Sequence, residues 1–240
     1  MDTFSFIASV VLVYAGLAIF TLGMAWRVWQ WSRTPRSPVR LALYPKPATA
    51  AGRFGKLMKD TFVAPQSFEM TPKLMIAAMA FHLAALAGFV GHLRLVREFD
   101  FMVAMLGEEG MATFAAWSGG IAGLVMMFAV LYWIGRRTFG PYRHLSTPED
   151  YLLLVLLLGV IVMGNHLRFV GHLPASVYIE WFQSLLRFQP TFPPELASSS
   201  TRLALNWHMV FVAAFLSYFP FSKLTHAIGA FATNLVRSSE

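Results

Sequence analysis

The chain has 240 residues, of which 57% are hydrophobic and only 13% charged, and it contains no cysteine. An average soluble domain carries roughly 25% charged residues, so this composition excludes an ordinary water-soluble domain and favours a membrane protein. Without cysteine the chain forms no disulfide, ligates no cysteine-bound iron–sulfur cluster and attaches no haem through a thioether. A metal bound by this chain must therefore be held mainly by histidine.

Five apolar runs approach the length of about 20 residues that a bilayer core requires. They cover residues 5–29, 74–96, 111–134, 151–170 and 203–224. We therefore predict an all-α fold, a bundle of five transmembrane helices that forms one integral membrane domain over residues 1–240. Asp2 stands where a signal peptide has basic residues, and no small-residue cleavage site follows the first run, so we expect this run to remain as an anchor.

The formal net charge of +7 is distributed unevenly along the chain, which argues against nucleic acid as the partner. Twelve basic residues lie in alternate loops and the tail, whereas Arg97 and Arg187 lie in the interior of the other two loops. The twelve are Arg33, Arg36, Arg40, Lys46, Arg53, Lys56, Lys59, Arg136, Arg137, Arg143, Lys223 and Arg237. The positive-inside rule then predicts an outer N-terminus and a cytoplasmic C-terminus, and five spans require opposite termini.

The longest polar stretch, about residues 30–73, is predicted to be a basic cytoplasmic loop. Its prolines predict an extended first half, and its second half has the apolar spacing of a short surface helix. The prolines are Pro35, Pro38, Pro45 and Pro47, and the apolar residues are Phe54, Leu57, Met58 and Phe62. Two interpretations are open for this helix: lipid anchoring, or docking of a cytoplasmic partner. We expect the proline-rich loop 172–202 to be an irregular cap.

Four histidines lie in or next to the second and fifth apolar runs, where no water satisfies an imidazole. His82 and His92 belong to the second predicted helix, and we place His208 and His226 together on the fifth. Because these two helices run in opposite directions, His82 shares the inner level with His226, and His92 shares the outer level with His208. Eighteen residues are five helical turns, so His208 and His226 are expected on one face, about 27 Å apart, with Pro220 as a kink between them. His144 and His172 fall in loops.

Two imidazoles from facing helices are the ligand set of a six-coordinate b-type haem, so two level-matched pairs predict two haems b. The alternative is that these histidines only pack and hydrogen-bond neighbouring helices. Near the outer level, Arg94 and Arg168 are candidate contacts for haem propionates. His166, also near this level, has three interpretations: a proton acceptor for quinol, a replacement haem ligand, or a hydrogen-bonding residue between helices.

The segments FHLAALAGFVGH and LNWHMVFVAAFLSYFPFSKLTHAIG resemble the haem b gamma subunit family of respiratory nitrate reductase. The resemblance implies that His82 and His226 hold an inner haem and that His92 and His208 hold an outer one. It further implies electron transfer between menaquinone or ubiquinone and a cytoplasmic iron–sulfur subunit. The expected location is a prokaryotic cytoplasmic membrane, in a complex that includes further membrane and periplasmic subunits.

Two departures point to a sister branch, the haem subunits of heterodisulfide reductase and of the Dsr complexes of sulphur metabolism. The long proline-bearing segment before residue 74 and the basic GHLRLVREF are closer to that branch. Nitrate reductase members carry a lysine near the quinone, where this chain has Glu108, Glu109 and Gly110. Glu108 is therefore a candidate member of the quinone site. The rival function of another class is a haem-free anchor or a proton-relaying transporter.

The charge distribution generates a testable topology. A cysteine introduced at Ser37 should resist an impermeant thiol reagent in intact cells, and one at Ser199 should react, because basic loops stay in the cytoplasm. The cysteine-free parent chain serves as the unlabelled control. The reverse labelling pattern would place the basic loop outside and overturn the predicted topology.

Overall fold

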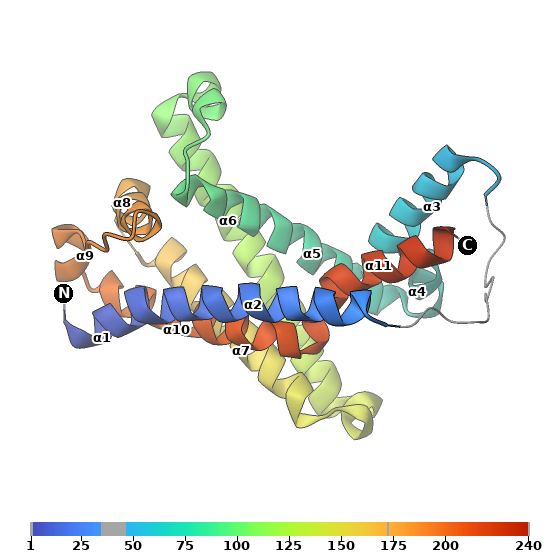
Figure 1. Ribbon diagram of the computed structural model, residues 1–240. Helices are drawn as coiled ribbons and strands as arrows, with labels where there is room; N and C mark the ends of the chain where they lie inside the picture. Colours follow the sequence, from blue (N-terminus) through green and yellow to red (C-terminus); the bar gives the residue numbers. More distant parts are fainter. Residues whose placement is uncertain (1, 35–46, 172, 240) are drawn as a thin grey trace. The chain divides into compact units, whose positions relative to one another are not determined.

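The computed structural model describes residues 2–34, 47–171 and 173–239, and every regular element among them is helical (Figure 1). The α-helices are α1 (Thr3–Phe6), α2 (Leu12–Ser32), α3 (Ala50–Phe62), α4 (Pro65–Met70), α5 (Pro72–His92), α6 (Asp100–Phe139), α7 (Pro148–Phe169), α8 (Ala175–Leu186), α9 (Pro194–Ser198), α10 (Thr201–Tyr218) and α11 (His226–Ser239). The predicted all-α class is confirmed. Ser37, His172 and the prolines predicted to extend the chain at 35, 38 and 45 lie outside the described residues.

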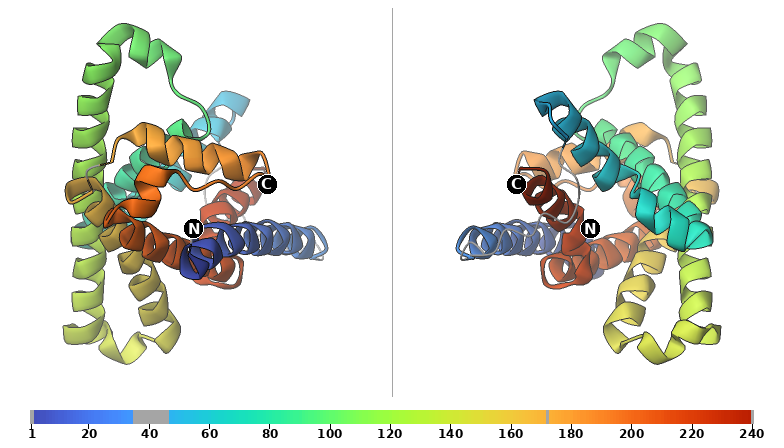
Figure 2. Two further views of the ribbon diagram at one scale, coloured as in Figure 1. Left: turned by 90° about the vertical axis from the view of Figure 1, so that its left-hand side faces the viewer. Right: turned by 90° about the vertical axis from the view of Figure 1, so that its right-hand side faces the viewer.

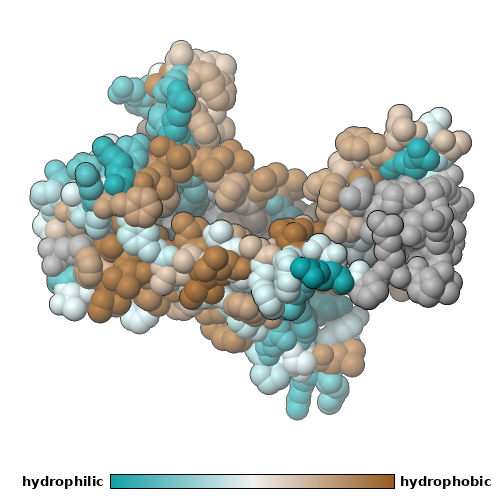
Figure 3. Space-filling view, viewed as in Figure 1, coloured by the Kyte–Doolittle hydropathy of each residue, from teal (hydrophilic) through white to brown (hydrophobic). Residues whose placement is uncertain are grey.

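Five helical segments are long and apolar enough to cross a membrane: Thr3–Ser32, Pro72–Leu95, Asp100–Phe139, Pro148–Phe169 and Thr201–Phe221. They coincide with the five predicted spans. Many large apolar side chains on these segments are exposed, as the brown surfaces in Figure 3 show, and lipid is the medium that such surfaces require. The protein is a multi-pass membrane protein. The side of the membrane on which each terminus lies stays a prediction.

The chain divides into two compact units. The first unit contains Met1–Leu17 and Ala77–Leu216, and the second contains Ala18–Ile76 and Ser217–Glu240. The single domain predicted over residues 1–240 stays a prediction.

In the first unit, α6 and α7 form an antiparallel hairpin, which both views of Figure 2 show, joined through the 3₁₀ turn Pro141–Leu145. Val130, Leu154 and Ile161 are buried between these helices. A capping box starts α7: the Thr147 side chain accepts from the N–H of Asp150, whose carboxylate accepts from the N–H of Thr147. This hairpin carries the residues of α7 that contact His208.

A second core in the first unit lies under the segment predicted to be an irregular cap. That prediction is wrong in part, because residues 172–202 contain α8 and α9. Trp181 and Leu185 of α8 pack with Leu196 of α9, Leu205 of α10 and Val10. Apolar residues spaced three and four apart in ASVYIEWFQSLL carry the helical signal that the surrounding prolines obscured.

The start of the first span is held to α10 by buried polar groups. Ser9 Oγ donates to Asn206 Oδ1 over 2.7 Å, and Asn206 Nδ2 donates to Ser5 Oγ over 2.8 Å. All three residues are at most 1% exposed. Ser9 belongs to a π-helical segment, Ile7–Val11, that joins α1 to α2. Inside a bilayer such mutual pairing replaces the water that these groups lack.

The prediction that His208 and His226 share one continuous helix is wrong. The helix α10 ends at Tyr218 and is followed by two 3₁₀ turns, Phe219–Phe221 and Lys223–Thr225, around an extended Ser222. Pro220 has no N–H to continue the helix, and Ser222 Oγ accepts from the N–H of Leu224 and so starts the next turn. His226 begins the separate helix α11. The shared face inferred from five continuous turns therefore does not hold.

Two other elements refine the predictions. The third span is longer than expected, because α6 covers 40 residues with a break at Gly107, where φ is 71° and ψ is 168°. A glycine tolerates this left-handed backbone, and Glu108 begins the long straight part of the helix. The short surface helix predicted in the basic loop is confirmed as α3, which lies in the second unit.

Candidate functional site

Both histidines of the second span lie on α5, as predicted. His82 Nδ1 is 2.7 Å from the carbonyl oxygen of Ala78, and His92 Nδ1 is 2.7 Å from that of Gly88. Both partners lie four residues earlier on the same helix. Both side chains are exposed on the protein surface. Ten residues of helix separate the two rings by about 15 Å along the axis.

His208 is the buried member of the set, with only 8% of its surface exposed. Its Nδ1 is 3.0 Å from the carbonyl oxygen of Val160 on the facing helix α7. Gly164 leaves room for the ring, since a Cβ at this position would lie 3.2 Å from His208 Cε1. A bulkier residue at 164 would displace the imidazole. One turn of α7 thus sets the position of His208. Val160 supplies the hydrogen-bond acceptor, and Gly164 leaves space for the ring.

His226, at the start of α11, has the same kind of contact: its Nδ1 is 2.9 Å from the carbonyl oxygen of Lys223. Of the six histidines that the structure describes, only the four predicted haem ligands pair Nδ1 with a backbone carbonyl. A carbonyl oxygen only accepts, so Nδ1 must carry the proton. In a neutral imidazole the lone pair then lies on Nε2, which is the tautomer that ligates iron through Nε2.

His92 and His208, the predicted outer pair, both belong to the first unit. His92 lies within electrostatic range of His208. The predicted inner pair, His82 and His226, is divided between the two units and stays a prediction.

Arg94 lies on the 3₁₀ turn that follows His92, and a carboxylate that the sequence analysis overlooked holds it. Its Nε and Nη2 each donate to one oxygen of Glu98 over 2.7 Å. This guanidinium lowers the pKa of the Glu98 carboxyl, which stays charged at neutral pH. The i,i+4 spacing of Arg and Glu in RLVRE was the available signal.

Arg168, the second predicted propionate contact, packs over Gly119 of α6, where a Cβ would meet its guanidinium at 3.2 Å. Arg168 lies within electrostatic range of both Arg94 and Tyr178. The Tyr178 hydroxyl is buried with no hydrogen-bond partner among the described residues, and burial raises its pKa, so it remains a protonated donor. Two guanidiniums, one carboxylate and one unpaired hydroxyl therefore lie near the C-terminal ends of α5 and α7, and His92 is the last residue of α5.

His166 points away from His208. It is two residues beyond Gly164, and two residues rotate a helical side chain by about 200°. Because Gly164 faces His208, His166 faces the opposite side of α7, where it is exposed. This geometry argues against His166 as a replacement for His208 in the same ligand pair.

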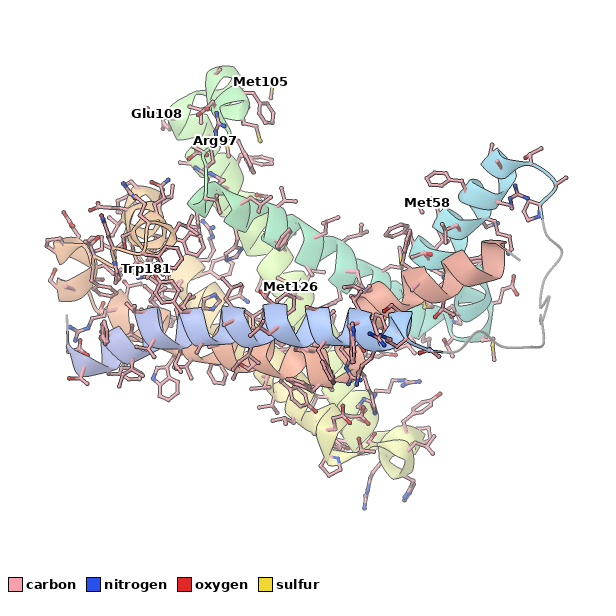
Figure 4. All side chains as sticks on the ribbon, in the orientation of Figure 1. Met58, Arg97, Met105, Glu108, Met126 and Trp181 are labelled. Carbon is pink, nitrogen blue, oxygen red and sulfur yellow. The ribbon has the colours of Figure 1, made fainter. Side chains whose placement is uncertain are left out.

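Glu108 is not brought to His166. Gly119 and Gly120 of α6 contact Arg168 and Phe169 at the end of α7, and Glu108 lies eleven residues before Gly119. Eleven residues of straight helix span about 17 Å, so Glu108 projects well beyond the end of α7. Figure 4 shows Glu108 there with Arg97 and Met105. The structure therefore does not support a quinone site that contains both His166 and Glu108.

A family model described as the nitrate reductase gamma subunit matches residues 61–239. A relative from Archaeoglobus fulgidus, named an Hdr-like menaquinol oxidoreductase cytochrome b-like subunit, is 26% identical over 94% of this chain and 77% of its own length. A relative of the same name from Archaeoglobus profundus is 26% identical over 91% and 74%. These matches confirm the resemblance drawn from the histidine motifs, including its Hdr-like branch.

The contact between Gly164 and His208 generates a prediction. Gly164→Val should displace the His208 ring and remove the haem that we expect it to hold, as measured by a pyridine haemochrome assay on the purified protein. Gly135→Val is the matched control, because a Cβ at Gly135 of α6 meets no described atom within 4 Å. A full haem complement in the Gly164→Val protein would show that the position of His208 does not govern haem binding.

Proposed function

Because the chain belongs to the nitrate reductase gamma subunit family, we propose that it is the membrane cytochrome b subunit of a quinol oxidoreductase complex. It carries electrons between the membrane quinone pool and an iron–sulfur partner on the cytoplasmic face. The relatives, named as subunits of menaquinol oxidoreductases, favour menaquinone over ubiquinone. They also favour the heterodisulfide-reductase-like branch, and with it a complex of sulphur metabolism, over respiratory nitrate reductase itself. Further membrane and periplasmic subunits complete the proposed complex.

The observation that carries the proposal is the contact between Nδ1 and a backbone carbonyl oxygen that four histidines share. His82, His92, His208 and His226 each direct Nδ1–H to a backbone carbonyl, which leaves Nε2 as the iron ligand. A histidine that only packs a helix interface has no need of one common tautomer. We assign His92 with His208 to an outer haem b and His82 with His226 to an inner one. Bound haem supplies reversible one-electron chemistry at potentials that its axial ligands and burial tune.

The remaining residues of the outer cluster have electrostatic functions in this proposal. Arg168 would bind a haem propionate, because the N–H donors of a guanidinium match the two oxygens of a carboxylate. Arg94 already donates to both oxygens of Glu98. With only one carboxylate for two guanidiniums, the cluster retains a positive charge that favours an added anion. The apolar spans exclude water around the ligands, as a buried redox site requires.

Quinol would approach from the bilayer, and the exposed side of α7 faces outward from the hairpin. We propose His166 on that side as the acceptor of a quinol proton, because it is exposed there and an imidazole nitrogen can accept a proton. Tyr178, whose buried hydroxyl lacks a partner, is a further donor in this region that the sequence analysis did not single out. The aromatic VYIEWF segment gave no signal specific enough to find it.

The experiment that tests the function is a haem count with histidine variants. Two haems b per chain, both low-spin, are expected in the pyridine haemochrome assay and the visible spectrum. Replacing His92 or His208 by Ala should remove one spectral component, and replacing His82 or His226 the other. His144→Ala, in a loop, is the control that should retain both.

Three outcomes of this experiment contradict parts of the proposal. A colourless protein would indicate the haem-free anchor or transporter instead. A single haem would remove the two-site arrangement. If His82→Ala and His92→Ala abolished the same component, the assignment of the pairs would be wrong.

A separate prediction tests the quinol site. His166→Phe should slow haem reduction by a menaquinol analogue about 100-fold, the loss expected when a positioned proton acceptor is removed. Both haems should remain bound and reducible by dithionite. A normal rate would place quinol oxidation elsewhere, and loss of a haem would make His166 a ligand.

A further inference from the structure

The second unit contains a marker of the membrane–water interface. Trp26, Trp29 and Trp31 are exposed near the end of α2, and the guanidinium of Arg33 lies 5.1 Å from the centre of the Trp29 ring. Exposed tryptophans next to basic residues gather at the boundary between hydrocarbon and headgroups. This aromatic belt therefore sets the level at which the first span leaves the bilayer.

The helix α11 lies at the same level. A Cβ at Gly229 would be 3.9 Å from the Trp31 ring, so α11 passes beside the aromatic belt. The helix α3 packs along α11, as Figure 1 shows, and Asn234 Nδ2 donates to Thr61 Oγ1 over 3.2 Å. Leu57, only 5% exposed, is buried on the inner side of α3. Contacts within one unit thus connect the belt to α11 and α11 to α3.

The side of α3 next to this packed face is apolar and uncovered. Phe54, Met58 and Phe62 recur every four residues and so form one stripe, which includes the Met58 labelled in Figure 4. Phe54 and Phe62 are both 63% exposed. Two phenylalanines exposed to this extent on a 13-residue helix need an apolar environment.

Basic residues accompany the stripe. Lys59 is exposed beside it, and Arg53 and Lys56 lie on the polar side, where Lys56 pairs with Asp60 at 2.7 Å. The helix therefore has three basic residues and one acidic residue. Figure 3 shows tan apolar and teal hydrophilic residues side by side over this helix. An apolar stripe with a basic polar face is the pattern of a helix that lies on an anionic lipid surface.

We propose that α3 is an interfacial helix that binds anionic phospholipids, with Phe54, Met58 and Phe62 among the acyl chains and Arg53 and Lys59 at the headgroups. The aromatic belt selects lipid over a protein partner, because it puts the α3–α11 pair at the level of the headgroups. The two spans that flank α3 in the sequence, ending at Ser32 and beginning at Pro72, keep it near the bilayer. The proposal requires neither bound haem nor quinone, although α11, against which α3 packs, begins at the candidate ligand His226.

Single cysteines test the depth of this helix, since the chain contains none of its own. Phe54→Cys and Lys56→Cys, about 200° apart around α3, are each spin-labelled in the full-length protein. The protein is reconstituted into vesicles of phosphatidylcholine alone or with an equal part of phosphatidylglycerol in both leaflets. Collisions of the label with oxygen, which dissolves in lipid, are compared with collisions with a water-soluble nickel chelate.

The label at position 54 should favour oxygen and the label at 56 should favour nickel, with the contrast greatest in the anionic vesicles. Replacing Arg53 and Lys59 by Gln should weaken the binding of α3 to the anionic vesicles about fivefold for each charge removed. The contrast between the two labels should then differ less between anionic and neutral vesicles. The far-ultraviolet circular dichroism of each variant verifies that the helices are intact.

Equal exposure of both labels to nickel in both vesicles would overturn the proposal. So would a label at 54 that leaves water only when purified partner subunits are added, because this result would make the stripe a protein-docking surface. A label that is buried to the same extent with and without phosphatidylglycerol would overturn the anionic specificity.

Discussion

A polar group inside the bilayer has no water to bind, and this constraint accounts for much of the arrangement of the protein. Each of the four candidate ligands satisfies Nδ1 with a backbone carbonyl, and Asn206 pairs with two serines of the first span. Arg94 is held by both oxygens of Glu98. The same bonds that remove the cost of burial also orient the groups, so an imidazole satisfied at Nδ1 presents Nε2 to a metal.

Small residues determine how closely the helices approach. Gly119, Gly120 and Gly123 of α6 lie against Arg168, Phe169 and Asn165 of α7, and Gly164 of α7 lies against His208. In a membrane the hydrophobic effect does not draw helices together, so this close packing and the hydrogen bonds between helices must do so. The glycines of the α6–α7 hairpin thus connect membrane packing with the position of a candidate iron ligand.

The second unit relates to the bilayer differently from the first. Its helices α3 and α11 are amphipathic and pack together, with the Asn234–Thr61 hydrogen bond between them. The apolar stripe on α3 is left for lipid, and the aromatic belt beside α11 marks the headgroup level. Because α11 begins at His226, this lipid-facing pair of helices adjoins a candidate haem ligand.

The sequence by itself determined the five spans, the all-α class, the surface helix α3 and the four histidines, because hydropathy, helical period and residue chemistry are local properties. The sequence spacing also predicts the i,i+4 pair of Arg94 and Glu98. The tertiary structure alone decided which groups meet across helices: the Val160 carbonyl and Gly164 with His208, and the separation of Glu108 from His166. It also decided where the fifth helix breaks, since Pro220 permits a kink or a stop, and capping by Ser222 makes it a stop. Contacts between residues distant in sequence depend on the register in which helices pack, and no local pattern contains that register.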